Sequence, residues 1–251
     1  MTAVADAPAA HQTGRRILAT MRVHAANPWT IIFTPWIVLF TILALNLLIW
    51  LSIVLAAGDN VDDDAFVANG GIAYLFVYMI VVAAQAMNQT FSFVVGMGTT
   101  RRDYFLGTAA IFVALSLQFG VGIAILAGIE RATGGWGAGG QFFAPAFLAD
   151  LPLWEIAVIY TMILLLMFFL GSAVAVVYLR WGPPALVMFF AALGLSLAGT
   201  AVLLSLNGAW PTVGRFFTQH SVLELSLYTL PVTVACAIVA WLLMRRSTPK
   251  G

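Results

Sequence analysis

Long apolar runs separated by short polar breaks dominate the chain. Six runs have about the 20 residues that a helix needs to cross the hydrocarbon core of a bilayer. They cover residues 31–56, 72–95, 104–126, 154–179, 185–206 and 223–244. Backbone polar groups cannot be left bare in lipid, so runs of this length must be helical. The pattern predicts an all-α membrane protein, with six transmembrane helices in one domain over residues 28–246 and a kink at Pro231 in the last helix.

A shorter amphipathic segment precedes the first run. Ile17 and Met21 fall at helical spacing, while arginines occupy the other faces. The pattern predicts a helix over residues 15–27 that lies in the membrane interface, with its arginines toward anionic headgroups. A basic flank that only sets topology would have the same composition. Residues 1–14, which are rich in Ala and Pro, predict a disordered tail, and residues 247–251 a short second tail.

The basic residues predict the orientation of the six helices. Nine of the 11 basic residues fall on one side of the predicted membrane: Arg15, Arg16, Arg22, Arg101, Arg102, Arg180, Arg245, Arg246 and Lys250. Cytoplasmic segments carry the excess of Lys and Arg, so this side should be the cytoplasm. Most acidic residues fall on the opposite side. We therefore expect a multi-pass protein of the cell membrane with both termini cytoplasmic.

Composition excludes several classes of function. The chain is 62% hydrophobic and 8% charged with a net charge of +1, so nothing favours a nucleic-acid partner. A phosphate-binding loop needs a lysine within a glycine-rich turn, and the only lysine is Lys250, near the carboxyl terminus. The histidines (His11, His24 and His220) lie outside the apolar runs, which contain no catalytic or metal-binding constellation. We expect neither an enzyme nor a cofactor or metal in this chain.

The centres of the apolar runs carry no charged residue. Ion-coupled carriers usually place Asp, Glu or His at membrane depth to bind the coupling ion. A carrier that binds an ion through backbone carbonyls remains an alternative. If the protein uses energy, we expect that energy to come from outside the bilayer.

The second apolar run carries a polar face. Gln85, Asn88, Gln89 and Ser92 stand at positions i, i+3, i+4 and i+7 and so share one side of the helix. Further polar residues are Asn46 in the first run and Gln118 in the third. These side chains fit either a substrate path or a seam between helices or subunits, where amides form interhelical hydrogen bonds.

The polar break between the second and third runs reads FSFVVGMGTTRRDYFLGT over residues 91–108. Thr99 or Thr100 can cap the third helix, and Asp103 lies near the positive amino-terminal end of that helix. The two arginines beside them, Arg101 and Arg102, would also be expected of a topology signal with no other role.

This break resembles a segment of actinobacterial-type permease subunits of type-2, export-type ATP-binding-cassette (ABC) transporters. In those subunits an aromatic–Gly–x–Thr–Arg–Arg–x–aromatic–Phe run follows the second helix. The motif covers only these 18 residues, whereas the six-helix layout with an amphipathic amino-terminal helix fits the family over the whole chain.

The resemblance implies a homodimer or heterodimer of permeases in membrane lipid. It also implies two separately encoded ATPase subunits, which bind the ATP and magnesium. Contact with the ATPase would fall on Gly98, Thr99, Thr100, Arg101, Arg102, Asp103 and Tyr104. The external segment before the last helix is short for the family, which favours a drug-, peptide- or lipid-like cargo over a polysaccharide. The competing hypothesis is a non-transporting membrane scaffold or immunity protein.

Overall fold

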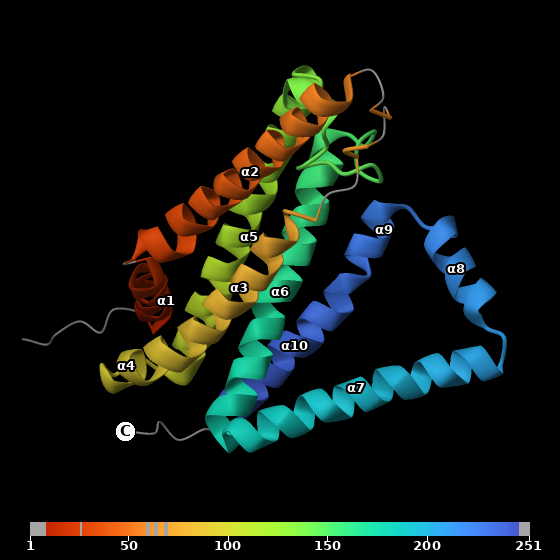
Figure 1. The fold of residues 1–251 in the computed structure, drawn as a ribbon. Helices are drawn as coiled ribbons and strands as arrows, with labels where there is room; N and C mark the ends of the chain where they lie inside the picture. The colour runs from red at the N-terminus through yellow and green to blue at the C-terminus, as the bar shows by residue number, and fades with distance from the viewer. Residues whose placement is uncertain (1–8, 26, 59–60, 63–64, 68–69, 246–251) are drawn as a thin grey trace, which may run out of the picture.

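A computed structural model describes residues 9–25, 27–58, 61–62, 65–67 and 70–245, with the backbone alone for residues 9–13 and Ser92. These residues form an all-α protein (Figure 1). Six helical segments are long and apolar enough to cross a membrane, as the sequence predicts. They are Trp29–Ala57, Ala73–Gly96, Arg101–Ala132, Leu153–Trp181, Pro183–Leu206 and Val222–Met244.

Several of these segments consist of more than one helix. In chain order the elements are α1 (Ala9–Ala25), η1 (Trp29–Phe33), α2 (Thr34–Ala57), α3 (Ala73–Gln85), η3 (Ala86–Thr90), α4 (Phe91–Gly96), α5 (Arg101–Ala132), η4 (Gly135–Gly139), α6 (Leu153–Trp181), α7 (Pro183–Leu206), α8 (Trp210–Gln219), α9 (Val222–Leu227) and α10 (Thr229–Met244). The elements η1 and η3 are single π-helical turns, whereas η4 contains residues with positive φ, among them Trp136 and Gly137. The break at Tyr228 lies just before Pro231, where the sequence predicts a kink.

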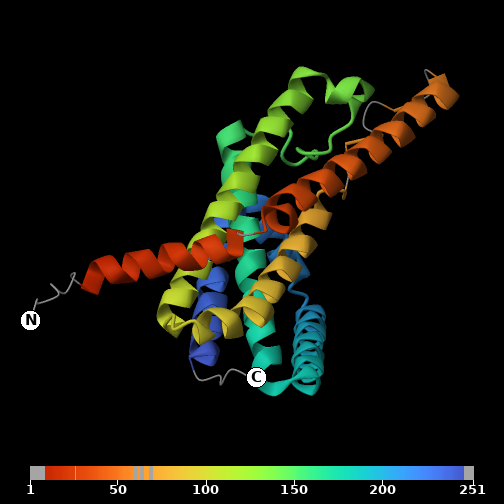
Figure 2. The same ribbon diagram turned by 90° about the vertical axis from the view of Figure 1, so that its left-hand side faces the viewer.

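Helices α5 and α6 form the centre of the bundle (Figure 1). Helices α3 and α10 pack against α6, while α1 packs across the first half of α5 and extends away from the bundle (Figure 2). We call the end that holds α1, α4 and the last turn of α10 the basic end, and the end that holds the loop after α5 the acidic end. The basic end is the predicted cytoplasmic side.

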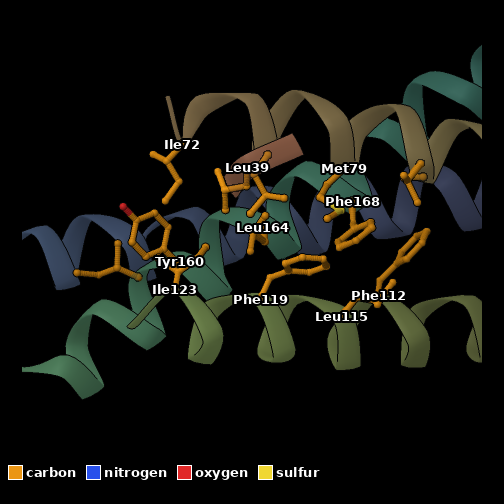
Figure 3. Packing of buried hydrophobic residues seen from close by; sticks show 14 of the residues in the cluster. Leu39, Ile72, Met79, Phe112, Leu115, Phe119, Ile123, Tyr160, Leu164 and Phe168 are labelled. Carbon is orange, nitrogen blue, oxygen red and sulfur yellow. The ribbon is translucent and has the colours of Figure 1, made fainter. Parts of the chain in front are cut away.

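The core lies where α5, α6 and α3 meet. The side chains of Phe112 and Phe119 on α5 point toward Leu164 and Phe168 on α6, with Met79 of α3 beside them (Figure 3). The rings of Phe112 and Phe168 stack with their centroids 4.7 Å apart. Close packing of this kind is what holds helices together in lipid, where apolar surface alone gives no preference for protein over lipid.

Helix α7 stands apart from this core. It leaves α6 at a corner formed by Gly182 and runs away from the bundle, and α8 and α9 then lead back to α10 (Figure 1). No side chain of α7 is buried. The fifth span therefore contacts the rest of the chain only near its ends.

Several predicted boundaries differ from the structure; the third span, for example, ends at Ala132 rather than near residue 126. Helix α1 begins at Ala9, so residues 9–14, which the sequence assigned to a disordered tail, are helical. No proline or glycine interrupts residues 9–13, and Ala9 and Ala10 favour a helix. The third span begins at Arg101 rather than Tyr104 because Thr100 caps it. The rest of the predicted tail, residues 1–8, and the second tail, 247–251, lie outside the described residues.

Candidate functional site

The turn between α4 and α5 is built to reverse the chain at the basic end. Gly98 has a φ of +87°, a left-handed conformation that suits glycine. Thr100 is extended, and its Oγ1 accepts a hydrogen bond from the backbone N–H of Asp103 at 3.1 Å. This bond satisfies one of the free N–H groups of the first helical turn. Of the two predicted caps, the structure selects Thr100.

Behind the turn, Asp103 and Tyr104 are buried. The Asp103 carboxylate lies 3.7 Å from the guanidinium of Arg16 on α1. The Tyr104 hydroxyl donates to the carbonyl of Ala86 at 2.8 Å and lies 2.9 Å from Thr90 Oγ1. Its ring, which is 0% exposed, packs between His24 and Phe91. These two residues hold the turn against the bundle and are not part of its outer surface.

The outer surface of the turn consists of Gly98, Thr99, Thr100, Arg101 and Arg102, all exposed or half-buried. The two arginines differ. Arg101 Nη1 donates to the carbonyl of Arg245 at 2.7 Å, which ties the start of α5 to the end of α10. Arg102 is exposed and makes no hydrogen bond or ion pair with any described residue.

The amphipathic helix α1 docks on α5 directly above the turn. Thr20 is 1% exposed and packs against Gly107, where a Cβ atom would lie 2.6 Å from the Thr20 Cβ. One turn further along α1, His24 Nε2 lies 2.9 Å from Oγ1 of Thr108, the residue after Gly107. Helix α1 therefore combines two features: exposed arginines, as the interfacial prediction requires, and one face fixed to the bundle.

A polar cavity of about 270 Å³ opens between α1, α3 and α5. Its polar lining consists of His24, Asn27, Thr30, Gln85, Gln89 and Thr90. Its apolar lining includes Ile111, Phe112 and Leu115 of α5. Burial lowers the pKa of His24 from 6.5 to about 4, so that side chain is neutral at pH 7. The cavity thus offers neutral hydrogen-bonding groups above an apolar floor.

The π-helical turn η3 forms one wall of this cavity. A π turn shifts the backbone hydrogen bonds by one residue, and such turns often occur at functional sites. Here the Ala86 carbonyl accepts hydrogen bonds from the hydroxyls of both Tyr104 and Thr90. The wall that carries Gln85 and Gln89 is therefore bonded directly to the first turn of α5.

The structure brings only part of the predicted polar set together. Gln85 and Gln89 line the cavity, and neither has a hydrogen-bond partner among the described residues. Asn88 lies on another side of η3, with its Oδ1 buried and unpaired within the described part of the chain. Asn46 donates to the carbonyl of Ile42 in its own helix, and Gln118 is exposed on α5. The side chain of Ser92 lies outside the described residues.

Comparisons with known proteins give no relative. No family model, characterised protein or solved structure matches the chain. Within the described residues, no three or more His, Cys, Asp or Glu side chains are arranged to hold a metal ion. The candidate site therefore rests on its own geometry.

Sequence reasoning missed a second polar centre, at the acidic end. Glu130 is 3% exposed. From the sequence it resembles the other acidic residues that are predicted to lie outside the membrane. Its carboxylate accepts hydrogen bonds from the indole of Trp136 and from the backbone N–H groups of Phe142, Phe143 and Ala144. This side chain therefore helps to fix the loop over residues 133–152 to the bundle. The available signal was an acid just before a glycine-rich loop, whose backbone N–H groups need acceptors.

The buried His24 predicts a pH-dependent docking of α1. Because its pKa is lowered from 6.5 to about 4, the neutral form is the one favoured in the docked state. Docking is fully favourable above pH 6.5 and weakens as the pH falls toward 4, by up to about 3 kcal/mol. Spin labels at the exposed Leu18 and Leu117, in a Cys236→Ser background, should give one distance at pH 7 and a broadened distribution at pH 4.5. His24→Asn, which cannot titrate, should remove this pH dependence; a distance that broadens equally in the variant would contradict the assignment.

Proposed function

We propose that this chain is the permease subunit of an ABC exporter, driven by a separately encoded ATPase. The six spans, the amphipathic α1 and the resemblance of residues 91–108 to export permeases support the proposal. One observation carries it: Tyr104 joins the first turn of α5 to the cavity wall at Ala86. A push on the turn at the basic end would therefore move the wall that holds Gln85 and Gln89.

In this mechanism the exposed residues of the turn contact the ATPase. Asp103 and Tyr104 transmit the movement from behind. The cavity admits cargo from the basic end or from the membrane interface beside α1. Its neutral polar groups and apolar floor suit an uncharged or amphipathic drug-, peptide- or lipid-like cargo.

The transmission step is tested by Tyr104→Phe in the complex of permease and ATPase. This variant keeps the ring packed between His24 and Phe91 but removes the hydroxyl. We expect cargo-stimulated ATP hydrolysis to fall about tenfold, while the basal rate and the assembly of the complex remain unchanged. The matched control is Tyr160→Phe, which removes a hydroxyl that donates to the Phe143 carbonyl near the acidic end. Equal stimulation in Tyr104→Phe and wild type would show that the hydrogen bond from Tyr104 to Ala86 does not transmit the movement.

The docking step is tested by the double variant Arg101→Ala/Arg102→Ala. We expect normal membrane insertion but loss of the ATPase from the purified complex, because the turn loses both cations. Arg180→Ala removes an arginine in the last turn of α6, also on the predicted cytoplasmic side, and should retain the ATPase. Retention of the ATPase by the double variant would reject the turn as the contact.

The alternative, a non-transporting scaffold or immunity protein, is favoured by one observation. No side chain of helix α7 is buried, and the helix could bind another membrane protein through its exposed surface. This hypothesis predicts that no ATPase co-purifies with the chain and that substitutions at the turn have no effect. A neighbouring gene for an ATPase with a phosphate-binding loop would favour the exporter.

A further inference from the structure

A second groove lies on the outside of the bundle at the basic end. It has a volume of about 350 Å³ and runs between the first turns of α5 and the last turns of α10. Its lining consists of Arg102, Phe105, Leu106, Val234, Ala237, Ile238 and Trp241. The rings of Phe105 and Trp241 lie 5.4 Å apart and join its two walls. The polar cavity beside α1 is lined by other residues, so the two sites are distinct.

The lining of this groove is apolar except for one arginine at its headgroup end. Six of its seven residues are apolar, and Val234 and Ile238 are 53% and 51% exposed. Both helices belong to spans, so these side chains face the space that lipid tails occupy. Arg102 is the one charged lining residue, and it lies in the first turn of α5, where the span meets the headgroup region.

The charge at this end of the groove is positive. Arg101 lies next to Arg102 in sequence, and its side chain reaches the carbonyl of Arg245 at the end of α10. The nearest acid in sequence, Asp103, is buried and faces Arg16 on α1. Arg102 therefore has no counter-ion among the described residues, while its neighbour adds a second positive charge.

We propose that this groove binds an anionic phospholipid, with one acyl chain between α5 and α10 and the phosphate on Arg102. Basic pockets between transmembrane helices on the cytoplasmic side recognise anionic headgroups in this way. The guanidinium can donate two parallel hydrogen bonds to phosphate oxygens. The bound lipid would connect the start of α5 to α10, beside the Arg101–Arg245 hydrogen bond.

The test uses the full chain alone in detergent, without an ATPase, so its outcome is separate from that of the proposed exporter. Native mass spectrometry would measure retained phosphatidylglycerol and phosphatidylcholine, each titrated into the delipidated protein. We expect wild type to prefer phosphatidylglycerol, and Arg102→Gln to weaken its binding about fivefold. Arg180→Gln makes the same charge change elsewhere at the basic end, where the guanidinium stacks on Trp181, and should bind like wild type.

A second variant tests the acyl-chain site without changing charge. Ala237→Trp fills the groove and should displace both phospholipids, whereas Ala191→Trp, on the exposed α7, should displace neither. The proposal is wrong if Arg102→Gln binds like Arg180→Gln, or if Ala237→Trp retains full lipid binding. It is also wrong if Ala237→Trp changes the oligomeric state without loss of lipid, because the groove would then be a contact between copies of the chain.

Discussion

Replacing Gly171 with valine is expected to separate α3 from α6 and to destabilise the bundle strongly. A Cβ atom at Gly171 would lie 2.5 Å from the carbonyl oxygen of Ile80 and 3.0 Å from its Cα. Both atoms belong to the backbone, so no rotamer change can relieve the clash. Overpacking of a helix contact costs about 1–3 kcal/mol of stability, and a clash with the backbone should cost about 3 kcal/mol or more.

The chain supplies a matched control and a built-in probe for this prediction. Gly194 also lies within a span, but a Cβ there meets nothing within 4 Å, so Gly194→Val makes the same change without the clash. Heating in detergent with a thiol-reactive dye reports unfolding through Cys236, the only cysteine of the sequence. Gly171→Val should lower the melting temperature by about 10 °C or more, whereas Gly194→Val should leave it near that of wild type. Equal melting temperatures would show that α3 and α6 do not approach this closely.

Replacing Glu130 with glutamine is expected to release the loop at the acidic end. Glu130 Oε2 accepts hydrogen bonds from Trp136, Phe142 and Phe143, and Oε1 from Phe143 and Ala144. A glutamine amide turns one of these oxygens into a donor that faces other donors. At least one buried N–H is then unpaired and the charge of the acceptor is lost, which together cost about 3–5 kcal/mol.

Chymotrypsin gives a local readout of this release. Phe142 and Phe143 are both 0% exposed in the folded loop and would become cleavage sites once the loop opens. We expect Glu130→Gln in nanodiscs to be cut there at least ten times faster than wild type. Glu155→Gln makes the same change in the first turn of α6, where no described group donates to the side chain, and should resist cleavage. Resistance of Glu130→Gln would mean that the other contacts of the loop, among them the hydrogen bonds from Arg131 to the carbonyls of Leu148 and Leu151, are enough to hold it.

The sequence predicted those parts of the fold that depend on solvent and local chemistry. Hydropathy located the six spans because apolar length is what the bilayer requires. A cap at Thr99 or Thr100 followed from local hydrogen bonding, and the structure selects Thr100. The spacing of Gln85 and Gln89 placed them on one face. The resemblance of residues 91–108 is what connects the turn to a partner ATPase, and that connection stays a prediction.

The features that the sequence did not predict depend on contacts between segments that are far apart in the chain. At the π turn η3, the Ala86 carbonyl accepts a hydrogen bond from the Tyr104 hydroxyl. This contact joins two spans, and no pattern within either span reveals it. Glu130 resembles the other external acids until the fold surrounds it with N–H groups. Asn88 was predicted to share a face with Gln85 and Gln89, but only the two glutamines line the cavity. Hydropathy identified α7 as a span but gave no information on whether another helix would cover it.

The exposure of α7 has a consequence for tolerance to mutation. Each side chain there has space on its outer side, so exchanging one apolar residue for another of different size creates neither a cavity nor a clash within the chain. In a scan of all substitutions, α7 should accept Ala, Leu, Val and Phe almost interchangeably and reject charged residues near its centre. Helices α5 and α6 should show the opposite pattern, with strict size limits at the positions that face each other. Comparing the two profiles would separate positions selected for solubility in lipid from positions selected for shape.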